Sequence, residues 1–367
     1  MSKKPIWLRN CWQVAAFASE LGQSILPRKF LGESVILFRR KDSTPVAMQD
    51  RCPHRLVPLS LGQLKDGVVR CGYHGMEFDE TGNCVSVPAQ TRIPGGAKVH
   101  TYPVVERHNL IWIWMGKAEL VDAVLIPDVH WFGHPDWAAA TGYKHMECDF
   151  RLITDNLLDL SHEAYVHQRT IGNDAVAEDL PVVNVDGNSI VWADREMNNI
   201  EPPPFFAHVL GCSDKVNRWQ SAVYMPPGLN MTEAGVHRVG TPREEACAWR
   251  VLHMITPETE NSAHYFWAMI RNYRLNDEQL TEFICKAVSD TFDEDKIVLE
   301  AQMKALLEEN PVQYPSVAIM VDEAPVRARR MLAKLIDREI EDENIIFQPV
   351  QFGYDPIGTP RPRVAAK

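Results

Sequence analysis

The stretch DNLLDLSHEAYVH (residues 155–167) sets two histidines and three carboxylates into an otherwise apolar run. Its leucines predict a buried helix, where an unpaired charge is costly. Buried imidazoles and carboxylates are usually hydrogen-bonded to a partner or bound to a metal ion. Asp159 and His162 are three residues apart and share a helical face. His162 and His167 are five apart and diverge by roughly 140° on a regular helix, so both reach one ion only if the helix ends or bulges between them. The alternative for this stretch alone is a pair of hydrogen-bonded core histidines.

The composition limits the partners of the chain. Its 367 residues are 45% apolar and 24% charged, as in soluble globular proteins, and this length indicates two domains. The formal net charge of −11 disfavours nucleic acid or an anionic membrane as a partner. No apolar run approaches the ~20 residues of a membrane span, and the N-terminus lacks a signal-peptide core. We therefore expect a cytoplasmic protein bound to neither nucleic acid nor a membrane.

The spacing of apolar residues divides the chain into two domains. Residues 1–118 are expected to form a small all-β domain, because short apolar runs such as residues 35–38 and 110–114 alternate with turn signals. Strand-like alternation returns over 182–272, and two long helices are expected at about 277–308 and 322–342. The chain is therefore predicted to be an α+β protein with an N-terminal domain over 1–118, a second domain over 119–345 and a tail over 346–367.

The most specific motif pairs cysteine with histidine twice. Cys52-Pro53-His54 is followed by Cys71-Gly72-Tyr73-His74. Zinc also accepts two cysteines and two histidines, but zinc fingers usually pair cysteine with cysteine and histidine with histidine. Here each loop supplies one thiolate and one imidazole, as a Rieske [2Fe–2S] centre requires: two cysteines on one iron and two histidines on the other. The other six cysteines are scattered and are expected to be packing residues.

A Rieske centre relays electrons but has no open position for oxygen, so an enzyme of this kind needs a second site. Two histidines and one carboxylate on one face of Fe(II) leave such positions free. His162 and His167 are the predicted imidazoles. The carboxylate candidates are Asp293, Glu294 and Asp295, of which Asp295 falls within the apolar face of the expected long helix. A carboxylate on a buried face needs a partner, so Asp295 is the predicted third ligand, with a buried salt bridge as the alternative.

On these motifs the chain resembles the oxygenase component of Rieske non-haem iron aromatic-ring oxygenases. The resemblance extends to about residue 340 and includes residues 51–55, 71–75, 111–114, 155–167 and 256–259. It is similar to the branch of vanillate O-demethylase and dicamba monooxygenase, and toluenesulfonate methyl-monooxygenase is similar too.

The resemblance implies a Rieske β-domain followed by a helix-grip catalytic domain, an antiparallel sheet curved over a long helix. It also implies a homotrimer in which the cluster of one subunit serves the iron of its neighbour. Asp159 corresponds to the bridging aspartate of the electron path, which would hydrogen-bond His162 in its own chain and His74 across the interface. Asp155 and Asn156 are given a supporting role. Asn230 and His253 fall where this branch has substrate-contacting residues, and the alternative for His253 is a hydrogen-bonded core histidine.

The expected function is that of a terminal oxygenase using O2 and electrons from a separate NAD(P)H-dependent reductase, with or without a ferredoxin domain. The expected reaction is O-demethylation of a methoxylated aromatic acid with release of formaldehyde. One alternative is hydroxylation of a ring or an alkyl side chain. From other classes, the alternatives are a Rieske electron carrier without oxygenase activity and a zinc-binding structural protein. The chain has no glycine-rich Rossmann motif, so it is not expected to bind the nicotinamide itself.

Overall fold

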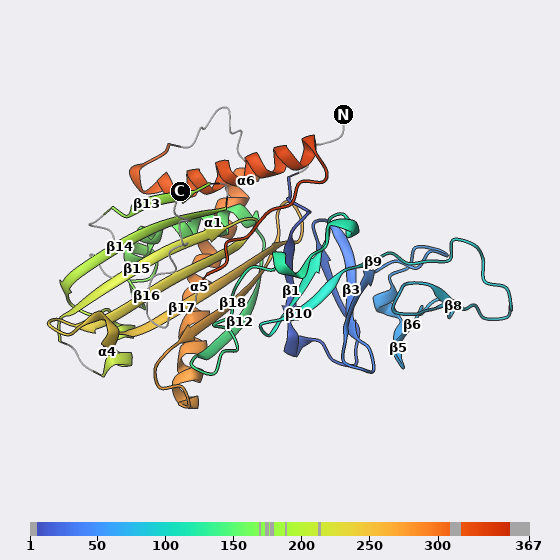
Figure 1. The fold of residues 1–367 in the computed structure, drawn as a ribbon, viewed down its shortest axis with the longest axis horizontal. Helices are drawn as coiled ribbons and strands as arrows, with labels where there is room; N and C mark the ends of the chain where they lie inside the picture. Colours follow the sequence, from blue (N-terminus) through green and yellow to red (C-terminus); the bar gives the residue numbers. More distant parts are fainter. Residues whose placement is uncertain are drawn as a thin grey trace.

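The computed structural model describes residues 6–352 apart from residues 169, 173–175, 177–179, 188, 212–213 and 309–316. A β-rich N-terminal part lies beside a larger part in which helices pack on one long sheet (Figure 1). The predicted α+β organisation is confirmed. No helix in the described part of the chain is long and apolar enough to cross a membrane.

The N-terminal part consists of three antiparallel sheets. Strand β3 lies between two of its cores, because Val35 and Leu37 point into one while Ile36 and Phe38 point into the other. Burial on both faces explains why this strand is an uninterrupted apolar run instead of an alternating one. The sheets are β1 (Trp12–Phe17), β11 (Leu110–Trp114) and β10 (Val104–Arg107); β2 (Leu26–Phe30), β3 (Glu33–Arg39), β4 (Pro45–Gln49) and β9 (Thr101–Tyr102); and β5 (Gln63–Lys65), β6 (Val68–Arg70), β7 (Glu77–Phe78) and β8 (Cys84–Ser86).

The second part is built on a seven-stranded antiparallel sheet in the order β12-β18-β17-β16-β15-β14-β13. Its central strands are buried along almost their whole length because helices cover one face and the N-terminal part and the C-terminal segment pack on the other side. The strands are β12 (Ala138–Met146), β13 (Val182–Asp186), β14 (Ile190–Ile200), β15 (Val216–Met225), β16 (Leu229–Arg238), β17 (Cys247–Pro257) and β18 (Ala263–Arg271).

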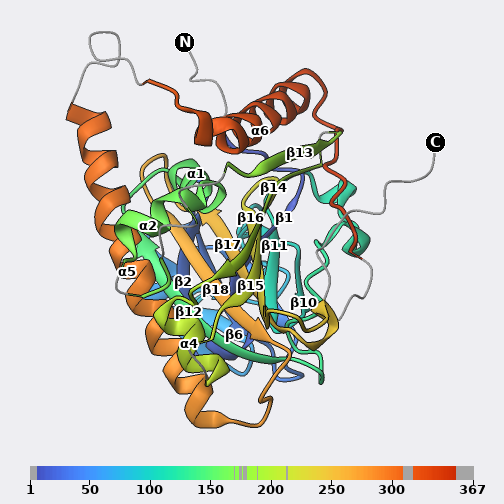
Figure 2. The same cartoon turned by 90° about the vertical axis from the view of Figure 1, so that its left-hand side faces the viewer.

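Two long helices frame this sheet, at the positions that the periodicity predicted. Helix α5 (Glu278–Glu308) packs on β12 and β18, and α6 (Glu323–Glu341) packs on β13, β14 and α1 (Phe150–Leu158) (Figure 2). The buried residues of α6 recur every three or four positions, as an amphipathic helix requires. Shorter helices are α2 (Glu163–Val166) and α4 (Pro204–Leu210), with the 3-10 turn η5 (Leu160–His162) before α2. Residues 346–352 form no helix or strand, but Phe347 and Phe352 are buried in the main core.

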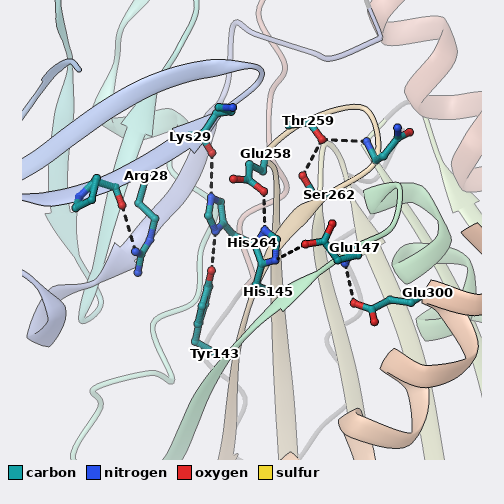
Figure 3. Close-up of polar contacts among 12 residues, drawn as sticks. Arg28, Lys29, Tyr143, His145, Glu147, Glu258, Thr259, Ser262, His264 and Glu300 are labelled. Carbon is teal, nitrogen blue, oxygen red and sulfur yellow. Dashed lines mark hydrogen bonds and ion pairs between the residues drawn. The ribbon is translucent and has the colours of Figure 1, made fainter. Parts of the chain in front are cut away.

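The two parts are joined by hydrogen bonds at the hairpin of β2 and β3 and at β1. The backbone N–H of Leu31 donates to Pro257 O (2.9 Å), and Thr256 Oγ1 donates to Val14 O (2.6 Å). Figure 3 shows the polar cluster at this junction, where His264 Nε2 donates to Lys29 O (2.9 Å) and the Tyr143 hydroxyl lies 2.9 Å from His264 Nδ1. Since a carbonyl only accepts, His264 carries its proton on Nε2, and Tyr143 donates to Nδ1.

Candidate metal centre and substrate cavity

His162, His167 and Asp295 converge on one point. His167 Nε2 lies 3.1 Å and His162 Nε2 3.4 Å from Asp295 Oδ1. One ligand atom from each of the three residues lies within 4.8 Å of the other two. Among the described residues, this is the one group of three or more His, Cys, Asp or Glu side chains that could hold a metal ion. Asp295 and His167 are buried. Two imidazole nitrogens and a carboxylate oxygen, aimed together from a buried wall, fit the donor set of mononuclear non-haem iron.

The local backbone explains how histidines five residues apart meet. Helix α1 ends at Leu158, η5 and the single turn of α2 follow, and His167 leaves helical geometry with φ −110° and ψ 27°. The helix therefore ends between the two histidines, as the spacing required. Asp295 comes from the buried face of α5, so the three residues depend on packing α5 against the α1–α2 segment.

The three groups perturb one another strongly. Burial alone raises the pKa of Asp295, but the hydrogen bonds and charges of His162 and His167 outweigh it and hold this pKa well below its usual range. Burial lowers the pKa of His162, yet Asp295 outweighs burial and raises it to about 9. The carboxylate is therefore ionised, which is the state that a metal ligand needs.

Outer contacts orient each of these side chains. His167 Nδ1 donates to Glu294 Oε2 (2.7 Å), His162 Nδ1 donates to the backbone carbonyl of Asp159, and Asn156 Nδ2 donates to Asp295 Oδ1 (3.1 Å). Both histidines thus direct Nε2 towards Asp295. The supporting role expected for Asn156 takes the form of this bond. Asp155 instead accepts hydrogen bonds from Nε and Nη2 of Arg329 in α6.

Asp159 contacts His162 as expected, but through its backbone oxygen. Its carboxylate accepts from the backbone N–H (3.1 Å) and the hydroxyl (2.5 Å) of Ser161. The carboxylate thereby caps η5, and its part in an electron path stays a prediction.

The predicted cluster ligands lie on two loops with the same backbone pattern. The N–H of Cys52 donates to Val57 O and that of Cys71 to Met76 O, and each cysteine carbonyl accepts from the N–H four residues later, at Leu56 and Gly75. Both of these later residues have positive φ, 62° and 75°. The two loops therefore contain the same turn, with the cysteine at the same place in that turn.

The two cysteines and the two histidines differ in burial. Cys52 and Cys71 are buried in the small core between β3 and β7, whereas His54 and His74 are exposed, with ring centroids 4.6 Å apart. Burial raises the pKa of Cys52, and the neighbouring Cys71 thiol adds to this rise. A pair of inner thiols and a pair of outer imidazoles fits the split donor set of a Rieske cluster.

A cavity of about 390 Å³ adjoins the three converging residues, which form part of its wall. Most of the wall is apolar and much of it aromatic. The aromatic rings come from α4, β17 and α5: Phe205, Phe206, Trp249, Phe283 and Phe292. A mostly apolar cavity of this size suits a small aromatic ligand.

The two predicted substrate contacts are placed differently. His253 lines the cavity, where its Nδ1 lies 2.7 Å from the Tyr265 hydroxyl and its Nε2 3.2 Å from Thr232 Oγ1. Burial lowers the pKa of His253 to about 3, so its ring is neutral at pH 7. Asn230, its partner across the β16–β17 ladder, is outside the cavity lining and donates to Thr154 Oγ1 of α1 (3.3 Å).

Sequence reasoning missed several residues of the site. Glu294 was considered only as an iron ligand and not as the partner of His167. The buried cavity residues Glu163, Arg218 and Gln220 were given no role. Glu163 follows His162 directly, which is a signal that could have been used. Arg218 and Gln220 lie in a strand whose partners depend on long-range pairing.

Comparisons with known proteins agree with this geometry. Residues 11–103 match the Rieske [2Fe-2S] domain, and residues 146–338 match the vanillate O-demethylase oxygenase C-terminal domain. The vanillate O-demethylase oxygenase subunit of a Pseudomonas species is 36% identical over 91% of this chain and 96% of its own. The toluene-4-sulfonate monooxygenase system iron-sulfur subunit of Comamonas testosteroni is 36% identical over 91% and 98%.

Solved structures have the same fold over most of this chain. Dicamba monooxygenase bound to 3,6-dichlorosalicylic acid matches with a TM-score of 0.86 and 34% identity, over 90% of this chain and 98% of that chain. The cofactors are therefore a [2Fe–2S] Rieske cluster and a mononuclear iron. The chain belongs to the Rieske non-haem iron monooxygenases, as an oxygenase component with the catalytic domain of the vanillate O-demethylase type.

Proposed function

We propose that this protein is the terminal oxygenase of a multicomponent system and O-demethylates a methoxylated aromatic acid. The observation that carries the proposal is the aromatic-walled cavity of about 390 Å³ whose wall includes His162, His167 and Asp295. Relatives named for vanillate and dicamba act on aromatic acids that carry a methoxy group. Because these relatives are named as subunits or components, the proposal includes a separate NAD(P)H-dependent reductase.

The proposal assigns a role to each group of residues. His162, His167 and Asp295 would hold the iron, and Cys52, His54, Cys71 and His74 would hold the cluster; together these cofactors would supply O2 activation and single electrons. Glu294 and the Asp159 carbonyl orient the two histidines. The aromatic wall orients the ring and excludes water. His253, neutral and fixed by Tyr265, would contact the substrate with its uncharged ring, and Asn230, its partner across the β16–β17 ladder, would support it.

The overall reaction balances with one O2, two electrons and two protons. A methoxy C–H becomes C–OH, and the second oxygen atom leaves as water. The resulting hemiacetal collapses to a phenol and formaldehyde. Purified oxygenase with a surrogate reductase, NADH and a panel of methoxybenzoates is expected to release formaldehyde in step with substrate loss. Oxidation of NADH with peroxide as the product and no aldehyde from any member of the panel would contradict the proposal.

A second candidate is hydroxylation of a methyl group on the ring, with the product kept intact. The similarity to the toluene-4-sulfonate monooxygenase subunit favours it. The same assay separates the two, because p-toluate or toluene-4-sulfonate would give a benzyl alcohol and no formaldehyde. An electron carrier without oxygenase activity would hold about two irons per chain instead of about three.

The proposal extends to assembly and domain limits. We place the Rieske domain at 1–118, the catalytic domain at 119–345 and a tail at 346–367, and the two matched family regions fall inside the first two ranges. We also propose a homotrimer in which Asp159 lies between the iron ligands of one subunit and His74 of the next. The exposure of His54 and His74 supports this, since a neighbouring subunit can reach them.

A further inference from the structure

Arg218 is a buried guanidinium on the wall of the catalytic cavity. Its Nη2 lies 3.4 Å from Glu163 Oε2, a long contact for a charge pair. The other oxygen of Glu163 accepts from Gln220 Nε2 at 2.6 Å, so this carboxylate is already turned towards Gln220. Among the described residues, the buried Nε and Nη1 of Arg218 have no hydrogen-bond partner. Each edge of the guanidinium therefore keeps a free donor.

Arg218 carries a positive charge on a wall that also holds the carboxylates Glu163, Asp290 and Asp295. Burial lowers the pKa of Arg218, and a second buried guanidinium, Arg195, lowers it further. Arg195 belongs to β14 and pairs with Gln220 across the β14–β15 ladder. Glu163 is the carboxylate in contact with Arg218. The charge pair of Arg218 with Glu163 is thus a single long contact, which leaves Nε and Nη1 for an added acceptor.

His253, the neutral imidazole of the wall, already has hydrogen-bond partners. Both ring nitrogens of His253 lie within hydrogen-bond distance of Tyr265 or Thr232. Of the described residues lining the cavity, Arg218 is the one arginine or lysine. It also lies over the ring of Phe206, 4.5 Å from its centroid, which holds the guanidinium plane beside the aromatic wall.

We propose that Arg218 binds the anionic group, carboxylate or sulfonate, of the aromatic substrate and so selects acids over neutral aromatic ethers. This inference rests on the proposed function and names the residue that sets its substrate class. A guanidinium fork matches a carboxylate or sulfonate with two parallel hydrogen bonds. A neutral ether leaves the buried donors of Arg218 unpaired, and this lowers its affinity.

The test compares an acid with its neutral isostere. Calorimetric binding to the holoenzyme is measured for 4-methoxybenzoate, 4-methoxybenzenesulfonate and 4-methoxybenzamide. Arg218→Gln is expected to weaken benzoate binding about 10- to 100-fold while changing benzamide binding less than about threefold. Arg218→Lys keeps the charge without the fork and should give an intermediate loss. The sulfonate arm shows whether one or both anions are accepted.

The matched control is Arg250→Gln. Arg250 is equally buried, lies 3.5 Å from the buried Glu233 and packs over Trp131, but does not line the cavity. It should leave the ratio of benzoate to benzamide affinity unchanged. If Arg218→Gln does not fold because Glu163 is left charged, the double variant with Glu163→Gln replaces it.

Equal weakening of acid and amide by Arg218→Gln would overturn the inference and leave Arg218 a structural partner of Glu163. Binding of the amide but of neither anion by the unaltered enzyme would overturn it as well. The binding assay does not depend on turnover. If acids bind through Arg218 but no formaldehyde forms, the proposal of demethylation fails and the anion site stands. If formaldehyde forms but Arg218→Gln weakens acid and amide binding equally, the anion site fails and demethylation stands.

Discussion

At the scale of single residues, two adjacent carboxylates of α5 contact the two ring nitrogens of His167. Asp295 lies 3.1 Å from His167 Nε2, and Glu294 lies 2.7 Å from its Nδ1. Successive residues of a helix point about 100° apart, so one carboxylate faces the core while the next lies at its edge. The His167 ring is thereby fixed in tautomer and orientation before any metal is bound.

Removing Glu294 is expected to weaken the metal site without unfolding the protein. Glu294→Ala should lower iron affinity about 10- to 100-fold, because His167 loses the group that orients its ring. Glu294→Gln, which can still accept a hydrogen bond, should lose less. Iron retained at graded chelator concentrations measures the effect. Asp293→Asn is the control, since Asp293 is exposed and pairs with Lys144 of β12. Equal iron retention in all variants would contradict the role of Glu294.

At the scale of elements, α6 holds the segment that carries the histidines. It packs on α1 through an apolar face, and the half-buried Arg329 binds Asp155. The metal site therefore depends on a helix that contributes no ligand to it.

Truncation of the buried face of α6 should lower stability. Leu332 is buried in the main core, so Leu332→Ala is expected to cost about 2–5 kcal/mol of unfolding free energy. Lys334→Ala, on the exposed face of the same helix, should cost less than about 0.5 kcal/mol. Urea midpoints measure both. A Leu332→Ala midpoint equal to that of Lys334→Ala would show that α6 does not support the core.

The junction of β2 with β18 should make stability depend on pH. An unfolded histidine takes up its proton near pH 6.5, whereas burial lowers the pKa of His264 to about 4. Between these values the unfolded state binds more protons. Acidification therefore removes up to about 1.4 kcal/mol of this contribution per pH unit, and the contribution is complete above pH 6.5.

His264→Gln tests this dependence. Gln does not titrate, so the loss of stability between pH 6.5 and 4 should become shallower than in the unaltered protein. Tyr143→Phe removes a partner of His264 but keeps the imidazole, and its slope should stay steep while its stability falls. Urea midpoints across this pH range give the answer, and parallel curves for His264→Gln and the unaltered protein would argue against it.

At the scale of the whole molecule, the cluster loops and the converging metal ligands belong to separate parts of one chain. Figure 1 shows the sheet of β5, β6 and β8 at the far end of the molecule from the catalytic sheet. Hydrogen bonds from β17 to β1 and from β18 to β2 join the two parts. This arrangement supports the proposal that each cluster serves the iron site of a neighbouring subunit.

Mixed oligomers test that proposal. Cys71→Ser removes a predicted cluster ligand and Asp295→Ala a predicted iron ligand, so each variant alone should be inactive. If electrons pass between subunits, co-expression of the two should restore activity to a substantial fraction of that of the unaltered enzyme. If electrons pass within one chain, the mixture should stay inactive. Size-exclusion chromatography with light scattering supplies the oligomeric state as the control.

The sequence by itself determined the features that depend on local periodicity and on ligand type. The expected helices at about 277–308 and 322–342 agree closely with Glu278–Glu308 and Glu323–Glu341. Helical periodicity also identified Asp295, because a carboxylate on a buried face needs a partner. The paired Cys/His motifs indicated the cluster because the order of ligand types distinguishes it from zinc.

Only the tertiary structure decided what depends on pairing between distant strands. Asn230 and Thr232 point to the same face of β16, and nothing in their alternation says that Thr232 lines the cavity while Asn230 lies against α1. Arg218 reaches Glu163 because β15 packs below α2, 55 residues away along the chain. Periodicity fixes which way a side chain points, whereas the packing of distant elements fixes what it meets.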